Sequence, residues 1–151
     1  MKALSIRPKY ADEIARGEKI EEYRTWKTAY RGDLLICASA YNHGAAYVRG
    51  HALCIVELFD IERDTFNNDY AWKLRNVRFI DPFPVKGKLH LYEVDNALIK
   101  PLSIDYHEAR RLWQDRGLCH KPRCITLETF KTIEKHGATS QNSQTPLTRA
   151  Y

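Results

Sequence analysis

Apolar residues near the start of the chain recur at helical spacing. Residues 4–17 predict a short strand or lead-in followed by a helix, because Pro8 suits a first helical turn and the apolar residues after it recur on one helical face. Gly17 is a suitable end for that helix, since glycine readily adopts the left-handed conformation found there. The chain therefore begins with a strand and helix unit.

Alternation replaces helical spacing in residues 19–26. A strand over this segment would place Ile20, Glu22 and Arg24 on one face and the intervening residues on the other. Because same-face neighbours in a strand lie about 7 Å apart, Glu22 and Arg24 are close enough to pair or to grip one ligand together. The same pattern is typical of a solvated strand edge with surface ion pairs. Both interpretations stay open on spacing alone.

Most of the chain up to residue 95 is strand-like. Residues 40–50 contain glycines and polar residues and predict a loop, whereas residues 65–76 are polar and predict irregular structure. Many short strands with few helices suggest an α+β fold built on a small closed or nearly closed β-barrel decorated by helices. The predicted strands cover residues 34–40, 51–61, 77–83 and 88–94.

The character of the sequence changes after residue 95. Residues 105–117 and 127–137 have apolar positions at helical spacing, and each segment ends in a glycine. Residues 138–151 are rich in Ser, Thr and Gln without periodicity, which predicts a flexible tail. We therefore expect a single domain over residues 1–137, followed by this tail.

The net charge and the cysteine content indicate the class of partner and the cellular compartment. The net charge of +5 attracts anions and so favours nucleic acid, nucleotides or an anionic surface as partners. No apolar stretch reaches the ~18 to 20 residues of a membrane span, and the first residues lack a signal-peptide pattern. Cys37 and Cys54 fall in apolar strand-like runs, where free cysteine behaves as a small buried hydrophobe. Together these features predict a cytoplasmic protein with reduced thiols.

Several motifs together resemble the ASCH domain of the PUA-like superfamily. The likeness covers about residues 3–95 and leaves residues 96–137 as a helical extension. Its densest part is Gly17-Glu18-Lys19 followed by Glu22 and Arg24. The other matching runs are residues 4–11, 30–32, 50–61, 70–72, 76–77 and 84–88.

The resemblance implies a PUA-like β-barrel flanked by helices, with a cleft that binds RNA or nucleotide-like ligands. By that resemblance Lys19, Glu22 and Arg24 are cleft residues, and Arg7 stands where better-known members often carry Gln. Aromatic side chains interleaved with cations suit base stacking beside phosphate contacts. The candidate ligand-binding residues are Arg7, Tyr10, Lys19, Glu22, Arg24, Trp26, Lys27 and Arg31.

A hydrolase is the main alternative. Some small bacterial members of the wider family remove the acetyl group from N4-acetylcytidine with a Lys-x-x-Thr element and a later Glu. Lys19 matches the lysine, Glu22 stands where the threonine would be, and Asp69 lies near the place of the later Glu. A carboxylate does not replace a hydroxyl in acyl transfer. Lys19 and Glu22 would instead serve as electrophile and general base on a nucleoside amide or an RNA phosphodiester.

Two further possibilities concern partners and metals. The positive rim would also suit a protein-interaction domain with acidic partners. Cys119, His120 and Cys124 lie at spacing that can begin a zinc site, but only His136 follows, so we expect no metal and no other cofactor. The sequence contains no nucleophile elbow and no Gly-rich phosphate loop. It leaves the oligomeric state open.

Overall fold

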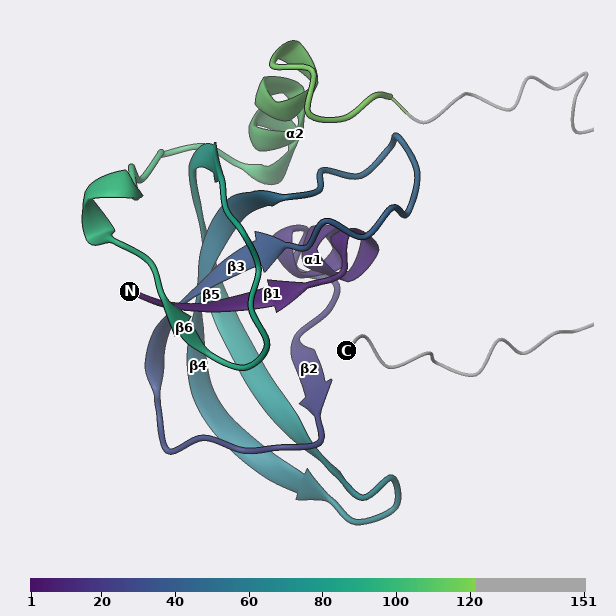
Figure 1. Cartoon of the computed structure of the whole chain (residues 1–151), viewed down its shortest axis with the longest axis vertical. Coiled ribbons are helices and arrows are strands. Elements are labelled where there is room, and N and C mark those ends of the chain that lie inside the picture. Colours follow the sequence, from purple (N-terminus) through teal and green to yellow (C-terminus); the bar gives the residue numbers. More distant parts are fainter. Residues whose placement is uncertain (122–151) are drawn as a thin grey trace, which may run out of the picture.

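The computed structural model describes residues 1–121, which form one mixed β-sheet with two α-helices and a short 3-10 helix (Figure 1). The sheet has six strands in the order β2-β5-β4-β3-β1-β6. Strand β1 runs parallel to β3, and every other neighbouring pair is antiparallel. The elements are β1 Lys2–Ile6, α1 Pro8–Ala15, β2 Glu21–Arg24, β3 Gly32–Ala38, β4 His51–Asp64, β5 Asp69–Pro84, β6 Tyr92–Glu93, the 3-10 helix Asn96–Leu98 and α2 Tyr106–Asp115.

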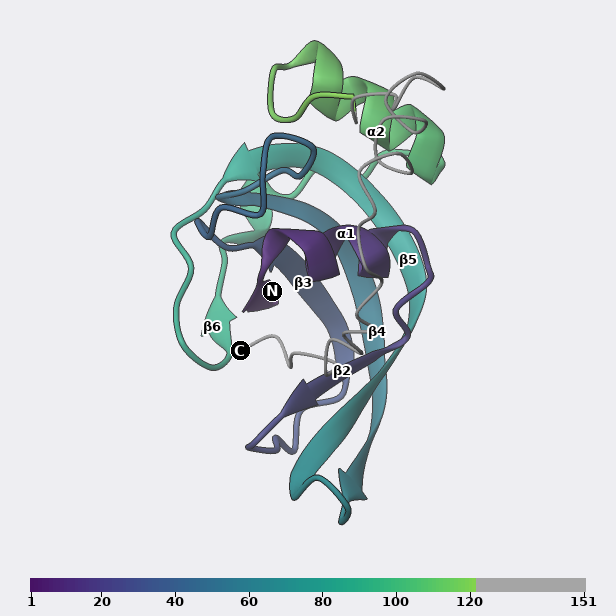
Figure 2. The same cartoon turned by 90° about the vertical axis from the view of Figure 1, so that its right-hand side faces the viewer.

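The predicted strand and helix unit at the start of the chain is confirmed. Pro8 occupies the first turn of α1, and Ala11, Ile14 and Ala15 are buried on one side of the helix. Gly17 follows the helix with φ of 77°, the left-handed conformation expected there. The sheet bends around α1, so that the helix lies inside the curve (Figure 2). This packing forms the larger of two apolar clusters, and the smaller one covers the other face of β1, β3 and β4.

The central strands were predicted, but the extent of β5 was not. Residues 65–76, expected to be irregular, contain a turn in which Asn68 has φ of 57°, after which β5 runs without a break from Asp69 to Pro84. Backbone pairing with β4 on one side and β2 on the other orders this polar stretch. Conversely, only Tyr92–Glu93 of the predicted strand at residues 88–94 pairs in the sheet.

The predicted closed barrel is wrong, because β2 and β6 are the two edges of an open sheet. These edge strands are only four and two residues long, so they offer few backbone groups for the ladder of hydrogen bonds that would close the sheet. Side chains join the two sides instead. The Nη2 atom of Arg24 on β2 donates to the carbonyl oxygen of Ser5 on β1 at 3.0 Å. The Trp26 ring, after β2, lies 4.7 Å from the His90 ring, before β6.

Helix α2 packs against the sheet and against α1. Its residue Trp113 is 1% exposed, and its ring centroid lies 6.4 Å from that of Phe79 on β5. The Tyr106 hydroxyl donates to the buried Asp12 carboxylate of α1, with oxygen distances of 3.0 and 3.2 Å. No helix among residues 1–121 is long and apolar enough to cross a membrane. The helix predicted at 127–137 and the tail at 138–151 lie outside the described residues.

Candidate functional site

Strand β2 presents two charged residues to the interior of the molecule. Glu22 pairs with Trp72 of β5 and Arg24 with Tyr70, so both side chains point to the concave face of the sheet. Glu22 is 0% exposed and Arg24 is 6% exposed. Ile20, expected on the same face, is 62% exposed, because β2 begins only at Glu21 and the alternation does not extend back to it.

Lys19, Glu22 and Arg24 meet in what we call the charged cluster. The Nζ atom of Lys19 lies 3.5 Å from one carboxylate oxygen of Glu22, and the Nε atom of Arg24 lies 3.4 Å from the other. Lys19 is the most accessible member, with 18% of its side chain exposed. Three residues singled out from the sequence are therefore in direct contact, with the carboxylate between the two cations.

The carboxylate of Glu22 is held by charge rather than by well-formed hydrogen bonds. Neither of its oxygens has a partner with good hydrogen-bond geometry among residues 1–121. Burial raises the pKa of Glu22 above its ordinary value, and the positive charges of Lys19 and Arg24 act in the opposite direction. A buried carboxylate of this kind needs compensating cations, so Glu22 fixes the positions of Lys19 and Arg24.

Aromatic rings border the charged cluster on the side of α1. The Nζ atom of Lys19 lies 5.5 Å from the Tyr10 ring centroid, and the Tyr10 ring lies 5.9 Å from that of His43. The guanidinium of Arg7 stacks 4.4 Å from the Tyr41 centroid, and the Tyr41 and His43 rings are 4.6 Å apart. We call Arg7, Tyr10, Tyr41 and His43 the aromatic rim. Its shape follows from the loop at residues 40–50, which folds back over the start of α1.

His43, like Tyr41, belongs to the aromatic rim but not to the candidate residues chosen from the sequence. Its Nδ1 atom accepts a hydrogen bond from the backbone N–H of Lys9 at 3.1 Å. Partial burial, reinforced by the charges of Arg7 and Lys9, lowers the pKa of His43. The ring is therefore a neutral acceptor and stacking surface at physiological pH. Its only sequence signal was its position between Tyr41 and Tyr47 in a glycine-containing loop.

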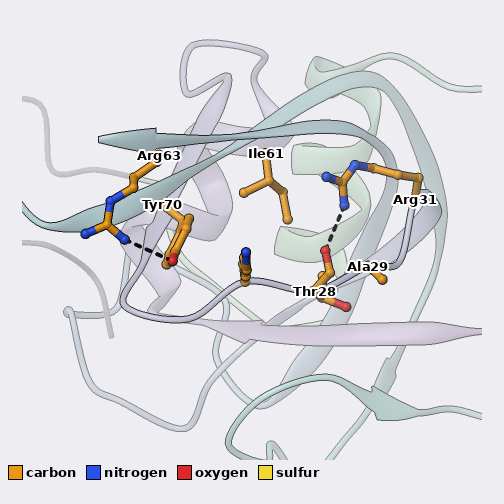
Figure 3. Close-up of a pocket in the computed structure, with 7 residues that line it drawn as sticks. Thr28, Ala29, Arg31, Ile61, Arg63 and Tyr70 are labelled. Atoms are coloured by element: carbon orange, nitrogen blue, oxygen red, sulfur yellow. Dashed lines mark hydrogen bonds between the residues drawn. The ribbon is translucent and has the colours of Figure 1, made fainter. Parts of the chain in front are cut away.

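The remaining predicted residues lie beyond the charged cluster. The Trp26 ring packs against Trp72 at 4.8 Å, and its backbone oxygen accepts from the Trp72 indole at 3.3 Å, so Trp26 is partly committed to the core. Lys27 and Arg31 line a separate cavity of about 660 Å³ between the loop after β2 and the β4–β5 hairpin (Figure 3). We call this the hairpin cavity, and it is lined by Lys27, Thr28, Ala29, Arg31, Ile61, Arg63 and Tyr70.

The predicted cysteine and histidine segment at residues 119–124 lies only in part within the described residues. Cys119 is 2% exposed, and Cys124 lies outside the described residues. Within residues 1–121 no group of three or more His, Cys, Asp or Glu side chains is arranged to hold a metal ion. Cys37 and Cys54 are buried free thiols, as their apolar surroundings in the sequence predicted.

Comparison of the sequence with known proteins identifies the family of the chain. A search of curated proteins found no match for the chain. The family profile of the ASCH domain matches residues 4–142, which include the charged cluster, the aromatic rim and the hairpin cavity. This match extends well beyond residues 3–95, where the motifs were recognised, and takes in the helical extension. The chain therefore belongs to the ASCH domain family.

Proposed function

We propose that this ASCH domain binds single-stranded RNA, with one nucleotide held at the charged cluster and the aromatic rim. The observation that carries the proposal is the buried Glu22 carboxylate, which fixes Lys19 and Arg24 beside a row of aromatic rings. Lys19 is exposed enough to meet a phosphate or a base oxygen, and Tyr41, at 48% exposed, offers a ring for stacking. The net charge of +5 attracts the polyanion.

The burial of Glu22 favours a supporting role over direct contact with a base. Its side chain is 1% exposed and already lies between two cations. A base amino group would have to displace Lys19 or Arg24 to reach it. The carboxylate instead keeps both cations in place before the ligand arrives, which reduces the ordering that binding requires.

Fluorescence anisotropy with a labelled single-stranded RNA of about ten nucleotides tests the proposal, a length within the ~4 to 16 nucleotides that other small β domains, those with the OB fold, typically cover. Lys19→Ala removes a charge-assisted contact and is expected to weaken binding by about 1.5 to 3 kcal/mol. Arg111→Ala, an exposed change of the same charge on α2, is the matched control and should have little effect. Equal affinity of wild type and Lys19→Ala would contradict the proposal.

A hydrolase is the second candidate, and the raised pKa of Glu22 next to Lys19 favours it, since a general base works best when its pKa approaches the working pH. Two features oppose the acetylcytidine version. Glu22 occupies the position of the threonine nucleophile, and Asp69 alternates onto the opposite face of β5 from Trp72, the partner of Glu22.

Turnover separates the two candidates. For a hydrolase, Glu22→Gln keeps the shape but removes the base, so turnover should fall by about two to four orders of magnitude. The substrates to test are N4-acetylcytidine, with release of acetate, and labelled RNA, with cleavage followed on a gel. If nuclease-free wild-type protein leaves both intact over hours, these two activities are excluded and the binding function stands alone.

A further inference from the structure

The hairpin cavity has the composition of an anion site that the charged cluster does not explain. Its cations are Lys27, Arg31 and Arg63, and no carboxylate lines it. Arg63 and Tyr70 lie at one end of the cavity and Arg31 at the other, with the apolar side chain of Ile61 between them (Figure 3). The cavity is therefore elongated, with positive charge at both ends and an apolar centre.

The register of the strands places this cavity next to the charged cluster. Across the concave face, Glu22, Trp72 and Ile61 form one row of paired residues. Arg24, Tyr70 and Arg63 form the next row. Because paired residues in a sheet point to the same side, both rows face the interior of the curve. The cavity and the charged cluster are thus neighbouring parts of the same concave face, with the buried Trp72 and Arg24 between them.

The acidic side chains Glu21 and Glu62 lie on the convex face of this part of the sheet and not in the cavity. On the convex face the ammonium of Lys73 pairs with Glu21 and, at 3.5 Å, with Glu62. On the concave face the guanidinium of Arg63 has only neutral partners among residues 1–121. It donates to the Tyr70 hydroxyl at 3.1 Å and to the Asn68 side-chain oxygen at 2.8 Å.

The other cations of the cavity are likewise without a carboxylate partner within the described chain. Arg31 donates to the backbone oxygens of Thr28 and Tyr30, at 2.9 and 2.8 Å. The Nζ atom of Lys27 lies 5.9 Å from the Tyr70 ring centroid. The hydrogen bonds from both arginines fix the directions of the guanidinium groups and go to neutral oxygens, so each guanidinium can still bind an anion.

We propose that the hairpin cavity binds two successive phosphates of the same RNA strand, one at Arg63 and one at Arg31, with the intervening sugar on Ile61. The inference rests on the proposed function, because the nucleotide at the charged cluster sets the position of the strand. Lys27 lines the same cavity and adds a third positive charge. The charged cluster and the cavity lie on the same concave face, so a longer RNA that reaches both gains contacts that a mononucleotide lacks.

The test compares Arg31→Gln/Arg63→Gln with Lys100→Gln/Arg111→Gln, which removes the same charge from exposed positions outside the cavity. Binding of a labelled ten-nucleotide single-stranded RNA is measured from about 0.05 to 0.3 M salt. Each phosphate contact on a single strand contributes about 0.7 to the slope of log K against log salt, so losing two should lower the slope by about 1.4. At 0.1 M salt this corresponds to about 25-fold weaker binding. Nucleoside 5′-monophosphates should bind both variants equally.

The outcomes distinguish the cavity from the charged cluster. If the cavity variant keeps the wild-type slope while Lys19→Ala weakens binding, the inference is wrong and the proposed function stands. If the cavity variant weakens binding and Lys19→Ala does not, the cavity binds RNA and the proposed site at the charged cluster is wrong. No effect of either change overturns both. Should the double variant not fold, the exposed Arg31→Gln alone replaces it, with an expected loss of about 0.7 in slope.

Discussion

The charged cluster predicts a strong and specific coupling between Glu22 and Arg24. The Nε atom of Arg24 lies 3.4 Å from the Glu22 carboxylate, and both side chains are almost fully buried. At an effective dielectric constant of about 20, unit charges at this distance attract by about 5 kcal/mol. Desolvation of the carboxylate, which raises the pKa of Glu22, offsets part of this attraction.

Removing one partner should therefore be more damaging than removing both. Arg24→Met leaves a buried carboxylate with Lys19 alone and should lower the free energy of unfolding by about 3 to 5 kcal/mol. Glu22→Gln in the Arg24→Met background removes the uncompensated charge and should restore most of that loss. Urea unfolding of the two single variants and the double variant measures the coupling. Additivity to within about 0.5 kcal/mol would refute the reasoning.

The pH dependence gives an independent check of the same prediction. Burial already raises the pKa of Glu22 above its ordinary value of 4.5, and loss of Arg24 removes a charge that lowers it. A group with a raised pKa in the folded state contributes stability that is present below 4.5 and lost as the pH rises through the folded-state pKa. The deficit of Arg24→Met should therefore be small near pH 4.5 and grow towards neutrality. The exposed pair of Lys2 and Glu93 is the control, and its disruption should show little coupling.

Three further predictions concern the frame of the site. Tyr106→Phe removes the hydroxyl that donates to buried Asp12 and should lower the free energy of unfolding by about 1 to 3 kcal/mol, measured by urea titration. Gly87→Ala places a Cβ atom 2.6 Å from the Ser5 hydroxyl oxygen and should lower the free energy of unfolding by about 1 to 3 kcal/mol. Adding Ser5→Ala should reduce this loss, and an equal loss with and without Ser5→Ala would contradict the contact. Burial raises the pKa of Cys37 to about 11, so iodoacetamide at pH 8 should label it only after unfolding, as followed by peptide mass spectrometry.

The parts of the fold that were predicted are those where one face is apolar or where a special residue ends an element. Pro8 and Gly17 mark the limits of α1, and alternation placed Glu22 and Arg24 on a common face. Alternation could not show that this face is buried, because a charged strand at a solvated edge has the same pattern. The recognition of the family supplied that part of the prediction.

The parts that were missed depend on long-range pairing. The first part of β5 carries polar side chains on a two-sided hairpin, so no apolar alternation reveals it, and its order comes from the ladders with β4 and β2. Arg63 and Tyr70 were missed for the same reason. The sequence does show alternation here, since Ile61 and Arg63 are separated by an acid and Tyr70 and Trp72 by an alanine. Only the register of β4 with β5 shows that these two pairs of residues lie opposite each other.

The open sheet determines where solvent can most easily reach the interior of the molecule. Between β2 and the side of β1 and β6, the described residues are joined by the contacts of Arg24 with Ser5 and of Trp26 with His90, and by no ladder of backbone bonds. Separating such a seam breaks few interactions, whereas parting any central pair of strands breaks a whole ladder. We therefore expect the molecule to open locally at this seam. Glu22 lies on β2 beside it, so we expect its buried carboxylate to exchange a proton with solvent when the seam opens.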